Sequence, residues 1–235
     1  MSQLVDMLAT MLFPHHCFAC GEVIVPRQQM CERCRETMPY ILPPLCPCCG
    51  RNEETCVCRG RRRHFERCVS PFYYEESAKQ GISYLKNRGY RVTVEGFASH
   101  MAELVRREYG GIPFDYVTGV PLHVKEHRER GFDQSALLAK SLAKHVGVPY
   151  LPLLYKCIHT RPQKELTALE RSGNLLGAFD VKDPDAVQGK TLLLVDDVIT
   201  TGATLDECAK MLKIYGVEEV YAITAVAAVL KKDGE

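Results

Sequence analysis

The cysteines of this chain are concentrated at one end, and this distribution constrains the fold more than any other feature. Ten of the 12 cysteines in the 235 residues lie at or before Cys68, and only Cys157 and Cys208 come later. A segment this small has too little apolar core to fold alone, so metal ions or cross-links are expected to stabilise it. We therefore predict an N-terminal module, residues 1–68, followed by a second domain, residues 69–235.

The spacing of the early cysteines indicates zinc. Two C-x2-C pairs separated by ten residues each present two thiolates to one point, as a tetrahedral Zn²⁺ site requires. A third C-x2-C pair and a tighter C-x-C pair follow, and they predict a second four-cysteine site. The expected ligands are Cys17, Cys20, Cys31 and Cys34 at the first site and Cys46, Cys49, Cys56 and Cys58 at the second. Cys48 competes with its neighbours, so the second ligand set stays open.

Disulfide bonds and an iron–sulfur cluster are the alternatives to zinc. Disulfides belong to oxidising compartments, but residues 1–13 lack the basic start of a secretory signal, and their apolar residues fall on one face of a helix. The usual iron–sulfur spacings are absent, and no apolar run approaches the roughly 20 residues that span a bilayer. We expect a cytoplasmic protein without membrane insertion, in which zinc is structural because four thiolates leave no open position for substrate.

After the cysteine-rich segment, apolar strand-like runs alternate with amphipathic helical patterns. Residues 116–122 precede a helical pattern at 135–145, and residues 192–198 precede another at 203–215. Such alternation is typical of a parallel sheet flanked by helices. Residues 220–230 predict a further buried strand. The formal net charge of +1 excludes a global basic field, so any affinity for nucleic acid must come from a local patch.

The most informative stretch runs from 192 to 204. A buried strand leads to two carboxylates, Asp196 and Asp197, which at the end of a parallel strand can accept hydrogen bonds from sugar hydroxyls. A threonine- and glycine-rich loop then opens a helix, where backbone N–H groups and hydroxyls favour a phosphate. An ordinary turn with a threonine N-cap would explain one threonine, but not the whole pattern. The loop and the start of the helix consist of Thr200, Thr201, Gly202, Ala203 and Thr204.

Basic residues of a second segment fit the same site. Residues 120–134 follow a strand and precede a helix that Asp133 is expected to cap. The segment carries Lys125, Arg128 and Arg130, and a strand-end loop could bring them to a pyrophosphate, which the planar fork of arginine suits. A solvated approach to the helix is the alternative.

Three other features lead to weaker expectations. Residues 156–174 are expected to cover the acceptor side of the pocket. Arg59–Arg63 contains four arginines in five residues, which could contact phosphates of a nucleic acid or form a solvated loop. Cys157 and Cys208 are expected to be buried small hydrophobic residues rather than nucleophiles.

The stretch from 192 to 204 resembles the phosphoribosyl-pyrophosphate (PRPP) signature of type I phosphoribosyltransferases. The resemblance implies that Asp196 and Asp197 hold the ribose 2′- and 3′-hydroxyls, and that residues 200–204 cradle the 5′-phosphate. In that family, Mg²⁺ is bound mostly by PRPP itself. The implied fold class is α/β, a type I phosphoribosyltransferase-like parallel sheet flanked by helices, with a small N-terminal zinc-ribbon module.

The whole chain resembles the ComF/ComFC-type late-competence family, which includes GntX-like proteins. The cysteine segment matches its double zinc ribbon, and Tyr84-Leu-Lys86, residues 120–134 and the PRPP motif occur in the expected order. The resemblance implies support of imported single-stranded DNA in natural transformation, beside a helicase-type ATPase like ComFA. The zinc ribbons and Arg59–Arg63 would then form the interaction surface.

Two classes of function follow from this resemblance. A transferase would displace pyrophosphate from ribose C1 through an oxocarbenium-like transition state, with Arg128 and Arg130 steadying the departing charge. No general base stands out in the sequence, which allows a PRPP- or nucleotide-binding adaptor without turnover. Purine or pyrimidine salvage ranks last, because salvage enzymes of this fold do not need a double zinc module.

Overall fold

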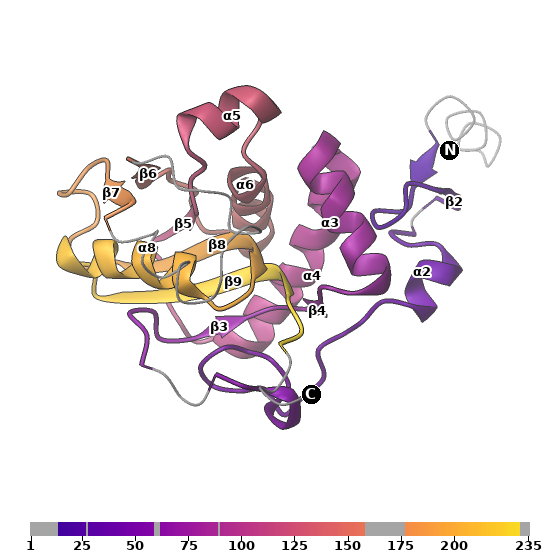
Figure 1. Ribbon diagram of the computed structural model, residues 1–235, viewed down its shortest axis with the longest axis horizontal. Helices are drawn as coiled ribbons and strands as arrows, with labels where there is room; N and C mark the ends of the chain where they lie inside the picture. The colour runs from indigo at the N-terminus through magenta and orange to yellow at the C-terminus, as the bar shows by residue number, and fades with distance from the viewer. Residues whose placement is uncertain (1–13, 27, 59–61, 89, 158–176, 231–235) are drawn as a thin grey trace.

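A parallel sheet forms the centre of the α/β domain (Figure 1). The computed structural model describes residues 14–26, 28–58, 62–88, 90–157 and 177–230. Within this part of the chain the sheet has the order β3-β9-β8-β5, and β4 also pairs with β9; every pairing is parallel. The strands are β3 (Cys68–Val69), β4 (Phe72–Tyr73), β5 (Tyr116–Gly119), β8 (Thr191–Ile199) and β9 (Glu219–Ala227).

Alternating residues of the central strand β8 face two different apolar cores. Leu193 and Val195 pack in one core with the helices on one face, whereas Leu192 and Leu194 pack in the other with α8. This period of two is what a strand covered on both faces requires. The first face is covered by α3 (Glu76–Arg88), α4 (Arg91–Tyr109) and α6 (Gln134–Val146), and the second by α8 (Ala203–Ile214) with the antiparallel pair β6 (Leu154–Lys156) and β7 (Phe179–Val181).

The parallel sheet with flanking helices confirms the expected fold class. The expected strands at 116–122, 192–198 and 220–230 correspond to β5, β8 and β9, and the expected helices correspond to α6 and α8. Asp196 and Asp197 lie within β8, which extends one residue beyond the expected strand at each end. The backbone keeps pairing with β9 past the carboxylates, as far as Ile199 opposite Ala227.

The cysteine module has little regular structure and contacts the α/β domain at two places (Figure 1). Its elements are β1 (His15–His16), β2 (Val23–Ile24), α2 (Glu32–Glu36) and the short helix η1 (Glu53–Thr55). In the first half, Phe18 is buried and packs edge-on against Phe97 of α4 with ring centroids 5.1 Å apart. The second half lies beside the start of α8, and Phe65 joins the core on that side.

Several further predictions from the sequence concern residues outside the site. Cys208 is buried as expected, but the expectation for Cys157 is wrong, because this residue is exposed just after β6 in the small antiparallel pair. Residues 1–13 and 158–174 lie outside the described residues, as do residues 59–61 of the arginine run. Of the helices in the described part, none has the length and apolar character needed to cross a membrane.

Candidate ligand-binding site and metal centres

Asp196 is held in place by two hydrogen bonds at the carboxyl end of β8. Its Oδ1 accepts one from the hydroxyl of Ser135, at the start of α6, at 2.8 Å. The same oxygen accepts another from the backbone N–H of Asp197, also at 2.8 Å. Burial raises the pKa of Asp196 far above its usual range, and the neighbouring charge of Asp197 adds to the rise.

Asp197 forms an ion pair with a lysine from a different part of the fold. Nζ of Lys86, in the last turn of α3, lies 3.0 Å from Oδ2 of Asp197. This oxygen is buried, and among the described residues the ion pair is its one polar contact. Burial alone would lower the pKa of Lys86, but the carboxylates of Asp197 and Asp196 outweigh it and the pKa is raised. The lysine is therefore a cation at neutral pH.

The loop after β8 has the geometry expected of an anion-binding helix start. Gly202 is the N-cap of α8 with φ of 80°, a left-handed conformation that glycine adopts without the steric cost of a Cβ. The N–H of Ala203 makes a long, weak hydrogen bond of 3.4 Å to the hydroxyl of Thr201. The helix N-terminus, with its partial positive charge, therefore follows directly after the strand that carries Asp196 and Asp197.

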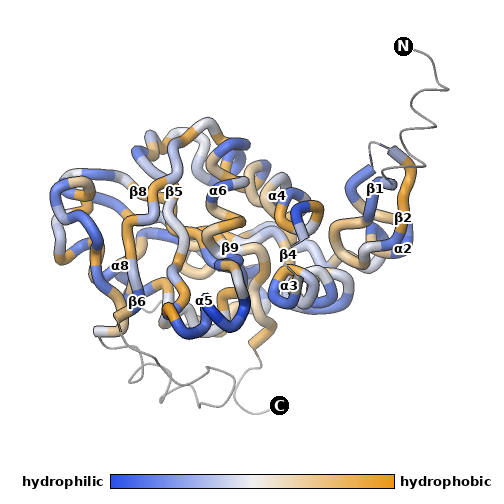
Figure 2. Tube along the Cα trace, turned by 90° about the horizontal axis from the view of Figure 1, so that it is seen from above, coloured by the Kyte–Doolittle hydropathy of each residue, from blue (hydrophilic) through white to orange (hydrophobic). Residues whose placement is uncertain are grey.

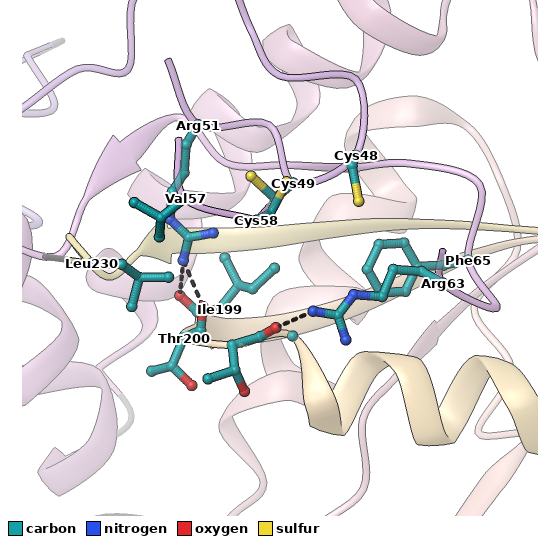
Figure 3. A pocket seen from close by; sticks show the side chains of 12 residues that line it. Cys48, Cys49, Arg51, Val57, Cys58, Arg63, Phe65, Ile199, Thr200 and Leu230 are labelled. Atoms are coloured by element: carbon teal, nitrogen blue, oxygen red, sulfur yellow. Dashed lines mark hydrogen bonds between the residues drawn. The ribbon is translucent and has the colours of Figure 1, made fainter. Parts of the chain in front are cut away.

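Two arginines of the cysteine module hold the other side of this loop (Figure 3). The buried guanidinium of Arg51 donates hydrogen bonds to the carbonyls of Ile199 at 3.0 Å and Thr200 at 2.7 Å. The guanidinium of Arg63 donates to the carbonyl of Thr201 at 2.6 Å. A cavity of about 200 Å³ separates the loop from the second cysteine cluster, and both arginines line it.

These contacts show which functional residues the sequence reasoning missed. Arg51 carries no motif of its own, so nothing near it in the sequence signals its role. Arg63 belongs to the run that was expected to face a nucleic acid or solvent, yet it is only 15% exposed and contacts the loop. Lys86 appeared in the family pattern without a role. Ser135 follows the expected cap Asp133, which could have pointed to its place at the start of α6.

The basic segment forms a short helix, α5 (Val124–Arg130), rather than a loop beyond the end of β5 (Figure 1). Its hydrophilic character is visible in Figure 2. Lys125, Arg128 and Arg130 are exposed, and in the described structure none of them forms an ion pair with Asp196 or Asp197. Among the described residues, the structure thus does not bring these cations into contact with the two carboxylates.

Asp133 closes the segment that carries α5. It caps α6 as expected, since its Oδ1 accepts a hydrogen bond from the N–H of Ala136 at 2.9 Å. Its Oδ2 also accepts one from the N–H of Leu122 at 3.1 Å, which ties the two ends of the segment together. At the far side, Glu126 pairs with Lys156 at 3.4 Å.

The cysteines gather into the two expected clusters. The first cluster comprises Cys17, Cys20, Cys31 and Cys34, and the second comprises Cys46, Cys49, Cys56 and Cys58. Within each, the four sulfur atoms lie within 4.8 Å of one another, and the closest pairs are 3.3–3.7 Å apart. Disulfide sulfurs would be about 2.0 Å apart, whereas four sulfurs around one Zn²⁺ are about 3.8 Å apart when each Zn–S bond is about 2.3 Å. The donor set therefore fits structural zinc at both clusters.

Comparisons with known proteins match both parts of the chain. The Phosphoribosyl transferase domain family matches residues 133–233, and the Double zinc ribbon domain family matches residues 8–71. Competence protein ComFC of Bacillus subtilis (strain 168) is 30% identical over 202 residues, which cover 81% of this chain and 80% of that protein. The chain belongs to the ComF family. DNA utilization protein YhgH of Salmonella typhi is 32% identical over 200 residues, with 83% of each chain covered.

Similarity to solved structures is weaker. Adenine phosphoribosyltransferase from Saccharomyces cerevisiae aligns with 60% of this ComF-family chain and 72% of its own, at 16% identity and a TM-score of 0.40. That score is too low to support an argument about the site. The double zinc ribbon and the phosphoribosyltransferase-like domain rest instead on the family matches and on the cysteine clusters.

Proposed function

We propose that this ComF-family protein binds PRPP together with Mg²⁺ at the end of β8 and acts in DNA uptake during natural transformation. One observation carries the proposal. Two carboxylates, Asp196 and Asp197, lie in the strand that leads directly into a glycine-capped helix N-terminus. Acceptors for sugar hydroxyls are thus followed, within a few residues along the chain, by donors for a phosphate. The names of relatives, a competence protein and a DNA utilization protein, support the cellular role.

In this proposal two segments of the chain contact PRPP. Amides and hydroxyls of residues 200–204 hold the 5′-phosphate, and Asp196 and Asp197 hold the ribose 2′- and 3′-hydroxyls. Lys125, Arg128 and Arg130 come from α5 to the pyrophosphate, which requires this short exposed helix to move inward. The buried Oδ2 of Asp197, whose one polar partner is Lys86, suits a cation or a hydroxyl donor. Mg²⁺, when bound with PRPP, would neutralise pyrophosphate charge.

If the protein turns PRPP over, one bond breaks and one forms at ribose C1. The C1–O bond to pyrophosphate breaks, pyrophosphate leaves with the electron pair, and an acceptor atom bonds to C1 through an oxocarbenium-like transition state. The chain contributes positioning and charge stabilisation rather than covalent chemistry. The acceptor is the unknown partner in this step.

The alternative is a non-catalytic adaptor that senses PRPP or a nucleotide. It would contact single-stranded DNA and a helicase-type ATPase through the zinc module. Exposed apolar side chains favour it, because Val23 and Val25 in the first ribbon are 59% and 65% exposed. In both cases the proposed units are residues 1–68 and 69–235, and the proposed location is the cytoplasm.

Calorimetry with PRPP and Mg²⁺, followed by a pyrophosphate-release assay across nucleobases, tests the proposal. We expect PRPP to bind, and Asp197→Asn to weaken binding at least tenfold. Asp185→Asn is the matched control, because Asp185 is an exposed aspartate away from the site. Pyrophosphate release supports the transferase. Binding without release, with loss of DNA or ATPase binding after zinc removal, supports the adaptor. Absence of PRPP binding in the zinc-loaded protein would overturn the transferase, and absence of binding to nucleotides as well would overturn the adaptor.

A further inference from the structure

The phosphate loop is held from behind by the cysteine module, and this arrangement connects two parts of the protein. Three successive carbonyls, those of Ile199, Thr200 and Thr201, accept hydrogen bonds from guanidinium groups (Figure 3). Arg51 also donates to the carbonyl of Ala228, just after β9, at 3.0 Å. One buried side chain thus joins the ends of both central strands to the module.

The direction of the carbonyls determines the direction of the amides. In a trans peptide the C=O of one residue and the N–H of the next point in opposite directions, and among the described residues the one cis bond is Pro43–Pro44. Because the carbonyls of residues 199–201 face the arginines, the N–H groups of residues 200–202 face away from them. Those N–H groups belong to the loop that we propose binds the 5′-phosphate.

The second cysteine cluster fixes the position of Arg51. The carbonyl of Arg51 accepts a hydrogen bond from the N–H of Cys46 at 2.7 Å, and the N–H of Gly50 donates to the carbonyl of Cys46 at 2.9 Å. Arg51 is therefore part of the same turn that presents Cys46 and Cys49 to the metal. A displaced turn would displace the guanidinium with it.

The cluster also suits the charge of Arg51. The side chain is buried, and the hydrogen bonds that its guanidinium donates to described residues go to neutral carbonyls rather than to carboxylates. A buried cation needs compensation. Four thiolates around Zn²⁺ carry a net negative charge, and Cys49 and Cys58 line the same cavity as Arg51. Four protonated thiols would not provide that charge.

We propose that the second zinc site is a functional part of the phosphate site, and that Arg51, supported by Arg63, is a positioning residue for its amides. The identity of the ligand in this inference rests on the proposed PRPP binding. The control of the loop conformation by Arg51 does not depend on that proposal. Loss of the second metal would let the loop carbonyls rotate, and the amides would lose their common direction. Loss of the first metal, whose cluster packs near α4, would leave the loop in place.

The test compares Arg51→Met with Arg35→Met, an exposed arginine on α2 of the same module. Zinc content, PRPP binding by calorimetry, and amide hydrogen exchange of residues 200–204 without ligand are measured for each. We expect Arg51→Met to retain zinc, to weaken PRPP binding at least tenfold and to speed loop exchange at least tenfold. Arg35→Met should match the wild type within twofold. The PRPP affinity and the loop exchange rate of Arg51→Lys should lie between those of the wild type and of Arg51→Met, because an ammonium lacks the fork that spans three carbonyls.

A second pair of variants separates the two metals. Cys58→Ser should speed loop exchange, whereas Cys20→Ser, in the first cluster, should not. Wild-type loop exchange in Arg51→Met, or equal effects of the two cysteine variants, would overturn the inference. If the wild type fails to bind PRPP, the proposed function fails. Hydrogen exchange in the loop still decides whether Arg51 and Arg63 hold the loop carbonyls in place. If Arg51→Met does not fold, Arg63→Met removes the corresponding hydrogen bond to the carbonyl of Thr201. Unchanged hydrogen exchange of the loop in Arg63→Met would overturn the inference.

Discussion

Nζ of Lys86 lies 3.0 Å from Oδ2 of Asp197, which joins the end of α3 to the end of β8. The lysine side chain is 29% exposed and the aspartate side chain 9%. The aspartate is therefore the partner that suffers most when the pair is broken, because a buried carboxylate without a cation is costly. The pair gives Lys86 a role in the site that its position in the sequence does not suggest.

Lys86→Met is expected to destabilise the protein by about 2 kcal/mol, between the values for exposed and for buried pairs. At about 2–4 °C per kcal/mol for a protein of this size, the melting temperature should fall by about 4–8 °C. Lys79→Met is the control, because Lys79 is an exposed residue of the same helix. The double variant with Asp197→Asn should recover part of the loss, since no carboxylate is then left unpaired. Equal melting temperatures for Lys86→Met and Lys79→Met would contradict the expectation.

Asp196 predicts an unusual pH dependence of stability. Burial and the charge of Asp197 raise its pKa to about 8, whereas an aspartate in the unfolded chain ionises near pH 4. Between these values the folded state holds a proton that the unfolded state has lost, so this residue's contribution to stability falls as pH rises through the window. Asp196→Asn removes that dependence. We expect its melting temperature, relative to wild type, to be higher at pH 8.5 than at pH 5.

The measurement is a series of thermal melts across this pH range, with Asp185→Asn as the exposed control. The control should leave the slope of stability against pH unchanged. The substitution keeps an acceptor for Ser135, so the effect reports on charge rather than on a lost hydrogen bond. If the difference in melting temperature between Asp196→Asn and the wild type is constant with pH, Asp196 is ionised in the folded protein over the whole pH range measured.

The sequence predicted the central part of the fold because local patterns determine it. Apolar runs and helical periodicity located β8 and α8 within a residue or two, and cysteine spacing gave both clusters. The contacts that complete the site come from residues far apart in the chain. Arg51 and Ile199 are 148 residues apart, and Ser135 and Asp196 are 61 apart. No local pattern encodes such pairs, and only the folded sheet brings them together.

The second cluster distinguishes between two candidate ligands, Cys58 and Cys48. Cys58 belongs to the four sulfurs that lie within 4.8 Å of one another, and Cys48 does not. The wild-type protein should therefore hold about two zinc ions, Cys58→Ser about one, and Cys48→Ser about two, because loss of one thiolate opens a four-coordinate structural site. Zinc released by acid or by thiol modification can be counted with a chromogenic chelator. One zinc in Cys48→Ser and two in Cys58→Ser would reverse the ligand assignment.

Gly50 lies close to the backbone of β3. Its φ is 66°, and an added Cβ would collide with the carbonyl oxygen of Cys68 and with Cα of Val69 in β3. Gly21, in the first cluster, has a similar φ of 73° but open space around an added Cβ. Comparison of alanine variants at the two glycines therefore distinguishes the cost of a left-handed backbone from the cost of a steric clash. Gly21→Ala should cost about 1 kcal/mol for the left-handed backbone alone, whereas Gly50→Ala should cost about 3 kcal/mol or more.

Urea unfolding of the zinc-loaded variants measures both costs, and zinc content shows whether each cluster survives. Because the strand that carries Cys68 is paired with β9, we expect the second cluster rather than the strand to shift in Gly50→Ala. That shift should carry Arg51 away from the carbonyls of Ile199 and Thr200, since Arg51 directly follows Gly50. Gly50→Ala should then weaken PRPP binding as well as stability, and Gly21→Ala should affect stability alone. If the two variants lose stability equally, the sheet accommodates the extra carbon, and the second cluster is less tightly seated than its contacts indicate.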